Sequence, residues 1–332
     1  MRKRVAIVCF QLGGPDTPAA VEPFLYNLFC DPDIIPLGVL GAVLRKPLAW
    51  YIARTRAKKV REHYDAIGGQ SPIRILTERQ ARKLEATLAS AMDAHVFVAM
   101  RYWDPLTQEV VAAVRAGQFD TLILLPLYPQ YSYATTLSSL KEWRRLDLPT
   151  DPAPDVHVVE HFYDHPLYIE AVVDRIELAL SHFHDPHAAH IVFSAHGLPL
   201  SLIEKGDPYQ KQIEETVRLV MADGGWPNAH TLCYQSRVGR QKWLTPALDP
   251  TIVELASRGE KHLLIVPISF VTEHIETLHE INIEARDHAA MLGIEQFEMM
   301  PAVGDSPRFI GALADLVLRA AGVEAAHAVR AV

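Results

Sequence analysis

The sequence predicts an α/β fold made of two Rossmann-like, doubly wound parallel-sheet halves with a cleft between them. Three observations predict it. Short, β-branched apolar runs recur along the chain, as in strands that are buried on both faces of a sheet. Amphipathic stretches of helical length lie between these runs, and this alternation is typical of βαβ units. With 332 residues and 49% hydrophobic content, the chain is long enough for two such halves.

The expected strands fall into two groups along the chain. The first group comprises residues 4–10, 95–100, 121–126 and 156–161. The second group comprises residues 190–194, 230–234, 261–268 and 295–300. Helical patterns between the strands include residues 78–92, 167–183 and 209–221. We therefore place the first half at residues 1–158 and the second at 159–305, with a C-terminal helix at about residues 306–321 expected to pack back on the first half.

Composition excludes several classes of protein. The net charge is -8 with 22% charged residues, which argues against general binding to nucleic acid. The apolar runs are all shorter than the roughly 20 residues that a spanning helix needs. The N-terminus has a basic start, but a short apolar run and no small-residue cleavage site follow it, so we interpret it as the first strand. A cytoplasmic protein is expected.

The three cysteines are scattered along the chain as Cys9, Cys30 and Cys233. They form no CxxC pair, so neither a zinc site nor an iron–sulfur cluster is expected. Cys9 lies within an expected strand and is most simply a small buried hydrophobe. The turn after that strand contains Gly13 and Gly14 but not GxGxxG, so dinucleotide binding is not supported.

An insertion at about residues 31–69 separates the first two strands by far more than one crossover helix requires. Its first part is apolar, at residues 34–37, 39–40, 43–44, 48 and 50–52. Basic residues accompany it, namely Arg45, Lys46, Arg54, Arg56, Lys58, Lys59 and Arg61. Two readings have equal weight. The insertion is either a helical hairpin packed on the core, or an apolar and basic lip that receives an apolar anionic ligand or rests on an anionic membrane surface.

The stretch at residues 263–284 changes abruptly from a buried strand to a cluster of acids and histidines. Glu276, Glu280 and Glu284 follow at i, i+4 and i+8, so an α-helix would place all three on one face. Like charges at this spacing oppose helix formation. A solvated helix face is the simple explanation. The position favours a functional one, because ligands of open α/β sheets bind beyond the carboxyl ends of the strands.

Polar and aromatic residues follow the other strands as well. They include Gln11, Leu12, Arg101, Tyr102, Trp103, Tyr128, Tyr131, Tyr133, Gln235, Ser236, Arg237, Trp243 and Phe270. His196, His274 and Glu276 should converge from neighbouring strand ends, and such a set binds a divalent cation or moves protons near neutral pH. The aromatic residues indicate a large, flat apolar ligand. Ser194 with His196 imitates a hydrolase pair, but a GxSxG elbow is missing.

These residues stand in motifs that resemble the ferrochelatase family along nearly the whole chain. The motifs are FQLGGPD (10–16), IGGQSPI (67–73), MRYW (100–103), LPLYPQYS (125–132), FSAHGLP (193–199), YQSRVG (234–239) with Trp243, and SFVTEHIETLHEI (269–281). The resemblance implies a chelatase-like fold of two Rossmann-like halves with the active-site cleft under a lip. It also implies insertion of Fe²⁺ into protoporphyrin IX, which gives protohaem, releases two protons and ends haem biosynthesis.

The motifs also carry implied roles for individual residues. His196 is implied to accept the pyrrole protons, opposite Glu276, and His196, Glu276 and His274 are implied to contact the metal. Porphyrin-binding positions are Gln11, Leu12, Arg56, Arg101, Tyr102, Trp243 and Phe270, with the two arginines near the propionates or the pocket entrance. Glu280 and Glu284 would carry protons or metal. The chain departs from the family pattern at Gln11, Glu273, His279 and Asn282, where Asn, Asp, Tyr and an acid are usual.

The resemblance sets further expectations. Fe²⁺ is a substrate, with no permanently bound cofactor and no iron–sulfur cluster, because the cysteine-bearing extension of the animal enzymes is absent. We expect a monomer that does not bind nucleic acid and that associates through its lip with the inner face of the cell membrane. One alternative is a coproporphyrin III ferrochelatase, a branch that often carries Tyr where Leu12 stands. Another is a non-catalytic haem or metal carrier, which would need no base and no row of acids.

Overall fold

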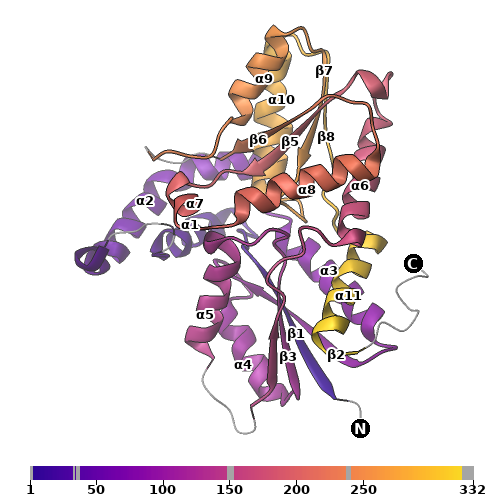
Figure 1. Ribbon diagram of the computed structural model, residues 1–332. Coiled ribbons are helices and arrows are strands. Elements are labelled where there is room, and N and C mark those ends of the chain that lie inside the picture. The colour runs from indigo at the N-terminus through magenta and orange to yellow at the C-terminus, as the bar shows by residue number, and fades with distance from the viewer. Residues whose placement is uncertain (1–2, 33, 35–37, 148–152, 237–240, 324–332) are drawn as a thin grey trace. The chain divides into compact units, whose positions relative to one another are not determined.

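The computed structural model describes residues 3–32, 34, 38–147, 153–236 and 241–323 (Figure 1). The chain divides into two compact units. The first unit comprises Met1–Leu127, Tyr133–Glu160 and Leu313–Val332. The second comprises Tyr128–Ser132 and His161–Ala312. Each unit contains one sheet, and the cleft predicted between the two halves stays a prediction.

The first unit contains a parallel four-stranded sheet in the order β2-β1-β3-β4. Its strands are β1 (Arg4–Gln11), β2 (Asp93–Met100), β3 (Thr121–Pro126) and β4 (Asp155–Val158). Its helices are α1 (Val21–Cys30), α2 (Gly38–Ala66), α3 (Ile73–Leu88), α4 (Thr107–Gly117) and α5 (Ser138–Leu146), with short turns at Pro18–Ala20 and Tyr133–Leu137. The apolar residues Ala6, Val8 and Phe10 of β1 pack with those of α4 and α5 into one core cluster.

The second unit repeats this order as β6-β5-β7-β8, again all parallel. Its strands are β5 (His190–His196), β6 (His230–Gln235), β7 (His262–Pro267) and β8 (Gln296–Met299). Its helices are α6 (Pro166–Leu180), α7 (Leu200–Glu204), α8 (Tyr209–Gly224), α9 (Leu248–Ser257) and α10 (Arg286–Met291), with a 3-10 turn at Pro186–Ala188 and a π-helix at Glu276–Ala285. The last helix, α11 (Pro307–Ala320), begins in this unit and ends in the first.

The predicted α/β fold with two parallel sheets is therefore confirmed. In both sheets the first strand lies between the second and the third. The order in which the chain adds strands therefore reverses between the first and third strands of each sheet. In sheets of this kind ligands bind beyond the carboxyl ends of the strands at that reversal. The expected positions in the first unit are the residues after β1 and β3, and in the second unit those after β5 and β7.

The insertion expected at residues 31–69 contains one long helix, α2, which packs against α1. Buried small residues at every fourth position, Ala49, Ala53 and Ala57, give α2 a smooth face that allows close helix packing. Leu37 and the side chain of Leu40 lie outside the described residues. We find no helix among the described residues whose length and hydrophobicity would let it cross a bilayer.

The acid-bearing helix differs from the expectation. The sequence predicts α-helical stacking of Glu276, Glu280 and Glu284, but residues Glu276–Ala285 form a π-helix. Its wider turn contains more residues than an α-turn, so the acids do not stack as the α-helical spacing implies. Ile281 and Ala285 fix the helix to the sheet, because they belong to the apolar core that β5, β7 and α9 share. π-Helical turns often occur at functional sites.

Candidate active site

The backbone of His196 is fixed at the carboxyl end of β5. Its N–H donates to Ser269 Oγ at 3.0 Å, and Tyr209 donates from its hydroxyl to the His196 carbonyl at 2.9 Å. The next residue, Gly197, lies so close to the Gln235 carbonyl that an added Cβ would come within 2.7 Å of that oxygen. This turn therefore requires glycine, and it directs the chain away from the strand immediately after His196.

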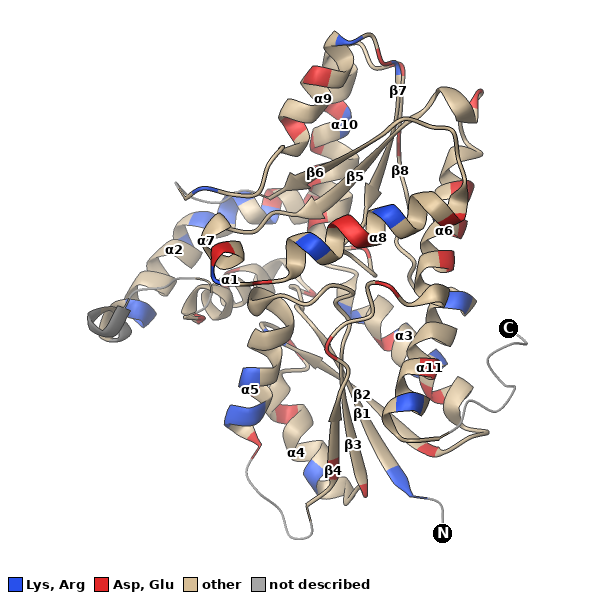
Figure 2. Ribbon diagram, viewed as in Figure 1, with Lys and Arg blue, Asp and Glu red and all other residues tan. Residues whose placement is uncertain are grey.

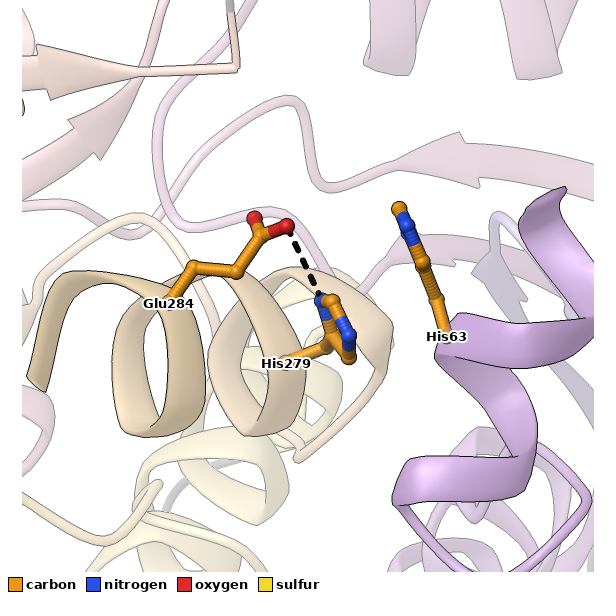
Figure 3. Close-up of side chains that lie close together, drawn as sticks. All are labelled: His63, His279 and Glu284. Carbon is orange, nitrogen blue, oxygen red and sulfur yellow. Dashed lines mark ion pairs between the residues drawn. The ribbon is translucent and has the colours of Figure 1, made fainter. Parts of the chain in front are cut away.

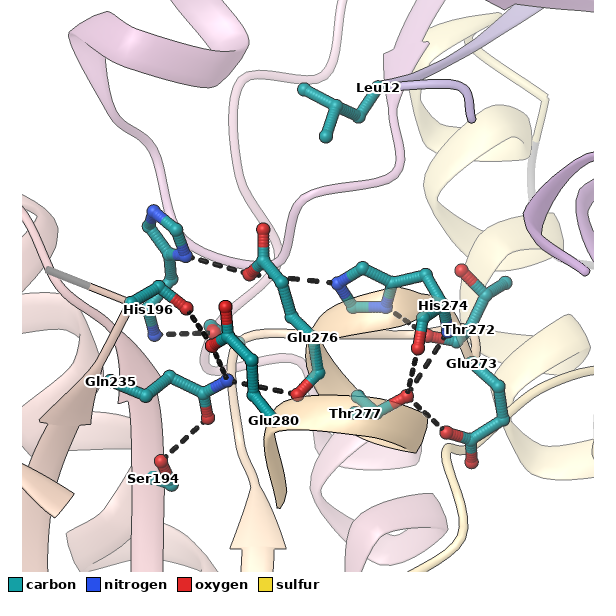
Figure 4. Close-up of polar contacts among 12 residues, drawn as sticks. Leu12, Ser194, His196, Gln235, Thr272, Glu273, His274, Glu276, Thr277 and Glu280 are labelled. Atoms are coloured by element: carbon teal, nitrogen blue, oxygen red, sulfur yellow. Dashed lines mark hydrogen bonds and ion pairs between the residues drawn. The ribbon is translucent and has the colours of Figure 1, made fainter. Parts of the chain in front are cut away.

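The side chain of His196 meets Glu276 at the start of the π-helix (Figure 4). His196 Nδ1 lies 2.8 Å from Glu276 Oε2, and His274 Nε2 lies 3.7 Å from the same oxygen. Figure 4 shows the Glu276 carboxylate between the two imidazoles. The other ring nitrogen of His274 is also in contact, because its Nδ1 lies 3.2 Å from the Thr272 carbonyl oxygen. The structure thus brings together the three residues that the sequence predicts to converge.

Electrostatic coupling shifts the pKa values of this pair. Burial alone would lower the pKa of His196, but the charge and hydrogen bond of Glu276 outweigh burial and raise it. Burial alone would raise the pKa of Glu276, yet the charge and hydrogen bond of His196, with a further contribution from His274, hold that pKa well below its usual range. Glu276 is therefore ionised at neutral pH, and His196 is a stronger base than a free imidazole.

Glu280 has the opposite shift. Burial, followed by the nearby charge of Glu276, raises the pKa of Glu280 to about 7, although hydrogen bonds from Ser236 and Gln235 oppose the shift. Ser236 donates from its hydroxyl to Glu280 Oε2, and its φ of 63° is unusual for a residue with a side chain. A carboxyl group with this pKa gains or loses a proton close to neutral pH.

Solvent exposure increases along the three acids. The Glu276 side chain is 18% exposed, Glu280 is half-buried, and the Glu284 side chain is 53% exposed. Glu284 Oε1 lies 3.7 Å from His279 Nδ1, as Figure 3 shows. The π-helix therefore presents carboxyl groups of increasing exposure, from Glu276 beside His196 to Glu284 in the solvent.

Two aromatic residues lie near the His196 turn in the second unit. The Phe270 ring lies 4.4 Å from the His274 ring and 6.3 Å from the His196 ring, measured between centroids. Trp243 pairs with Pro199, and its ring lies beside Gly197. Phe270 and Trp243, both named from the sequence, thus lie next to the His196 turn.

Four predicted residues of the first unit lie together at the carboxyl ends of β1 and β2. Arg101 N–H donates to the Gln11 carbonyl at 2.9 Å, and Tyr102 N–H donates to the Leu12 carbonyl at 3.1 Å. The Gln11 side chain is buried, and its oxygen accepts from the Leu12 N–H. Arg56 is placed elsewhere, on α2, with its guanidinium 5.7 Å from the Phe29 ring centroid.

Several residues support the site through hydrogen bonds. Ser194 donates to the Gln235 side-chain oxygen at 2.7 Å, and Gln235 Nε2 donates to the Glu276 carbonyl at 3.2 Å. Ser194 is thus hydrogen-bonded to Gln235, in line with the absence of a hydrolase elbow from the sequence. The contacts of Tyr209 and Ser269 with His196 could not be predicted, because neither residue lies at a spacing that points to His196.

Comparisons with known proteins agree on one family. The model of the family described as ferrochelatase matches residues 4–321. A ferrochelatase of Thermosynechococcus vestitus is 47% identical over 327 residues, which cover 96% of this chain and 83% of the relative. A ferrochelatase of Geotalea daltonii is 47% identical over 317 residues, which cover 96% and 98% of the two chains.

Solved chelatase structures share the fold. SirB from Bacillus subtilis with Fe³⁺ matches with a TM-score of 0.56 and 14% identity, and 96% of each chain is covered. The sirohydrochlorin chelatase SirB from Bacillus subtilis subspecies spizizenii in complex with cobalt matches with a TM-score of 0.54 and 12% identity, also over 96% of each chain. At this identity the likeness concerns the fold alone.

Proposed function

The chain belongs to the ferrochelatase family, and on that premise we propose that it inserts Fe²⁺ into protoporphyrin IX with His196 as the proton acceptor. It is a metal chelatase, a lyase of haem biosynthesis whose substrates are a porphyrin and Fe²⁺. The observation that carries the proposed site is the 2.8 Å contact between His196 Nδ1 and Glu276 Oε2. The roles of the other residues follow from their relation to this pair.

A planar porphyrin carries two pyrrole N–H protons that block metal entry, so a base must remove them. Glu276 accepts a hydrogen bond from Nδ1–H of His196, which fixes the tautomer and leaves the Nε2 lone pair to accept a proton. The raised pKa of His196 strengthens this base. Phe270 and Trp243 supply apolar walls for the macrocycle, and a tight wall can favour the puckered porphyrin whose lone pairs face the metal.

The row of acids is proposed to carry protons or hydrated iron between His196 and the solvent. Its exposure increases from Glu276 to Glu284. Its middle member, Glu280, has a pKa of about 7 and can exchange a proton near neutral pH. His274 contacts the same Glu276 oxygen as His196 and is the proposed third metal contact.

A direct assay tests this function. The protein is mixed anaerobically with Fe²⁺ or Zn²⁺ and either protoporphyrin IX or coproporphyrin III, and metallation is followed by the absorption spectrum. We expect turnover with higher kcat/KM for protoporphyrin IX. Preference for coproporphyrin III would assign the chain to the other branch, and stoichiometric binding without turnover would identify a carrier.

The raised pKa of Glu280 predicts a pH-dependent stability effect. The folded state keeps a proton on Glu280 that the unfolded chain releases above about pH 4.5, so stability falls as pH rises towards about 7. Glu280→Gln removes this penalty. We expect the variant to be about 2 kcal/mol more stable than the wild type at about pH 8 and equal to it at about pH 4. Urea unfolding at both pH values measures the difference.

Glu284→Gln is the matched control for Glu280→Gln. It removes a carboxylate from the same helix, but one whose side chain is 53% exposed and screened by solvent. If Glu280→Gln raised the free energy of unfolding equally at both pH values, Glu280 would not be protonated in the folded state. The gain would then come from relief of the charge repulsion with Glu276.

The exposed face of α2 supports the proposed membrane association. Val43, Leu44, Trp50 and Tyr51 are 83%, 63%, 52% and 62% exposed. At 100° per residue these side chains lie on one side of the helix, within about 120° of its circumference. Lys and Arg recur along α2 (Figure 2). An apolar stripe with basic neighbours is typical of helices that lie in an anionic lipid surface.

Vesicle binding tests this surface. Leu44→Ser combined with Trp50→Ser should weaken binding to anionic vesicles by about tenfold or more, since full burial of such side chains contributes about 1.5–3 kcal/mol each. Met291→Ser, which removes a 79% exposed apolar side chain from α10, is the matched control and should leave binding unchanged. Binding should also weaken with salt, because ions screen the basic residues. Equal effects of both changes would make α2 a structural helix.

The absence of an iron–sulfur cluster stays a prediction. Cys9 and Cys233 are buried, and burial raises the pKa of both thiols to about 12. The monomeric state and the position on the inner face of the cell membrane stay predictions.

A further inference from the structure

We propose that Asp31 is a positioning residue that fixes the Arg101 guanidinium for a carboxylate of the porphyrin. The inference rests on the proposed function, which places Arg101 near the propionates. It adds a residue that the sequence gives no role, and it explains how an arginine at the end of a strand keeps one orientation.

Asp31 receives two donors on one oxygen. Its Oδ2 lies 2.7 Å from Arg101 Nη2 and 2.7 Å from the Tyr102 hydroxyl, which donates to it. The Asp31 side chain is 1% exposed, and its own N–H donates to the Leu28 carbonyl at the end of α1. A carboxylate buried to this degree is costly unless it is paired, so the pair holds both side chains in place.

Arg101 is restrained on other sides too. Its Nε lies 3.3 Å from Ser138 Oγ, and its carbon Cζ lies 5.1 Å from the centroid of the Tyr102 ring. Glu142, another acid near Arg101, is held by two 2.8 Å contacts to Arg145. The Arg101 side chain is 17% exposed, and its other N–H groups have no partner among the described residues.

The place of this group in the fold favours a ligand. Arg101 follows β2 directly and bonds to Gln11 at the end of β1, which is the edge where parallel sheets bind ligands. A planar guanidinium held at one edge presents its remaining N–H groups in the fork that matches a carboxylate. Tyr102, predicted as a porphyrin contact, is 2% exposed and acts here through Asp31.

The first unit contains a natural control. Asp147 also follows a helix, and it accepts from Arg115 Nη2 and Trp143 Nε1 at 3.2 Å each. Arg115 lies at the end of α4, whose last residue, Gly117, contacts Arg4 at the start of β1. The same kind of aspartate clamp therefore occurs at the amino ends of the strands, away from the proposed ligand edge.

The test compares Asp31→Asn with Asp147→Asn on a free-acid porphyrin and its methyl ester. Asp31→Asn keeps the shape but removes the charge, so we expect KM for the free acid to rise about tenfold while kcat changes less than about twofold. The factor by which KM rises should be at least about fivefold smaller with the methyl ester than with the free acid, because the ester lacks the carboxylates. In an Arg101→Ala background, Asp31→Asn should add no further rise. Thermal midpoints are recorded for every variant.

Other outcomes overturn the inference. Equal KM changes with acid and ester, a similar acid-specific rise for Asp147→Asn, or an additive effect in the Arg101→Ala background would show a purely structural aspartate. If the wild type turns over but Arg101→Ala does not distinguish acid from ester, the positioning role is also rejected, while metal insertion stands. Failure of the wild type to metallate protoporphyrin IX would instead reject the proposed substrate, and the same comparison is then made with coproporphyrin III.

Discussion

Replacement of His196 with Ala should lower kcat by about 10²- to 10⁴-fold, the range expected for loss of a general base. The reason is local, because Glu276 Oε2 lies 2.8 Å from His196 Nδ1, and in the proposed function this contact leaves Nε2 to accept a proton. Porphyrin affinity should change little, since Phe270 and Trp243 stay in place. Single-turnover metallation measures the chemical step, and porphyrin fluorescence quenching measures binding.

His190→Ala is the matched control for His196→Ala, since His190 lies at the other end of the same strand. It is buried and contacts Thr231 at 2.9 Å and Glu260 at 3.5 Å, so its loss should lower stability without affecting kcat of the folded enzyme. More than about a tenth of wild-type kcat in His196→Ala would exclude His196 as the base and make it a structural histidine.

The strands could be predicted from sequence because they are buried on both faces. The expected strand at residues 121–126 matches β3 (Thr121–Pro126), all of whose residues are buried. The expected strand at 156–161 ends too late, since β4 is Asp155–Val158 and is partly exposed, which weakens its apolar signal. The helix expected at 78–92 is α3 (Ile73–Leu88), because the chain enters the helix directly after Pro72.

The candidate site was predictable where each residue follows a strand. His196 and Glu276 could be named because strand ends meet at one edge of a sheet. The π-helix could not be predicted from sequence, because acids at i and i+4 are compatible with either an α- or a π-helical turn. The roles of Asp31 and Tyr209 could not be predicted either. Both residues contact the strand ends from other parts of the chain, and a periodic sequence pattern does not reveal such contacts.

Glu276→Gln should be the most damaging change in the row of acids. The amide keeps the shape and one hydrogen-bond acceptor for His196 Nδ1, but removes the charge that raises the pKa of His196. We expect kcat to fall by about 10²-fold or more with porphyrin affinity little changed. Glu280→Gln and Glu284→Gln should have progressively milder effects, seen mainly as a higher KM for Fe²⁺, because each lies closer to the solvent.

The thermal midpoints of the three variants distinguish a conduit, meaning a row of acids that carries protons or metal, from a solvated helix face. The lowered pKa of Glu276 contributes stability above about pH 4.5 that is lost as pH falls, and the raised pKa of His196 contributes stability below about pH 6.5 that is lost as pH rises. Glu276→Gln should therefore lower the thermal midpoint most at about pH 5–6, where both groups are charged. A solvated face predicts the reverse, with near-normal kinetics and slightly higher midpoints in all three variants. Equal and small kinetic effects at Glu276, Glu280 and Glu284 would exclude the conduit.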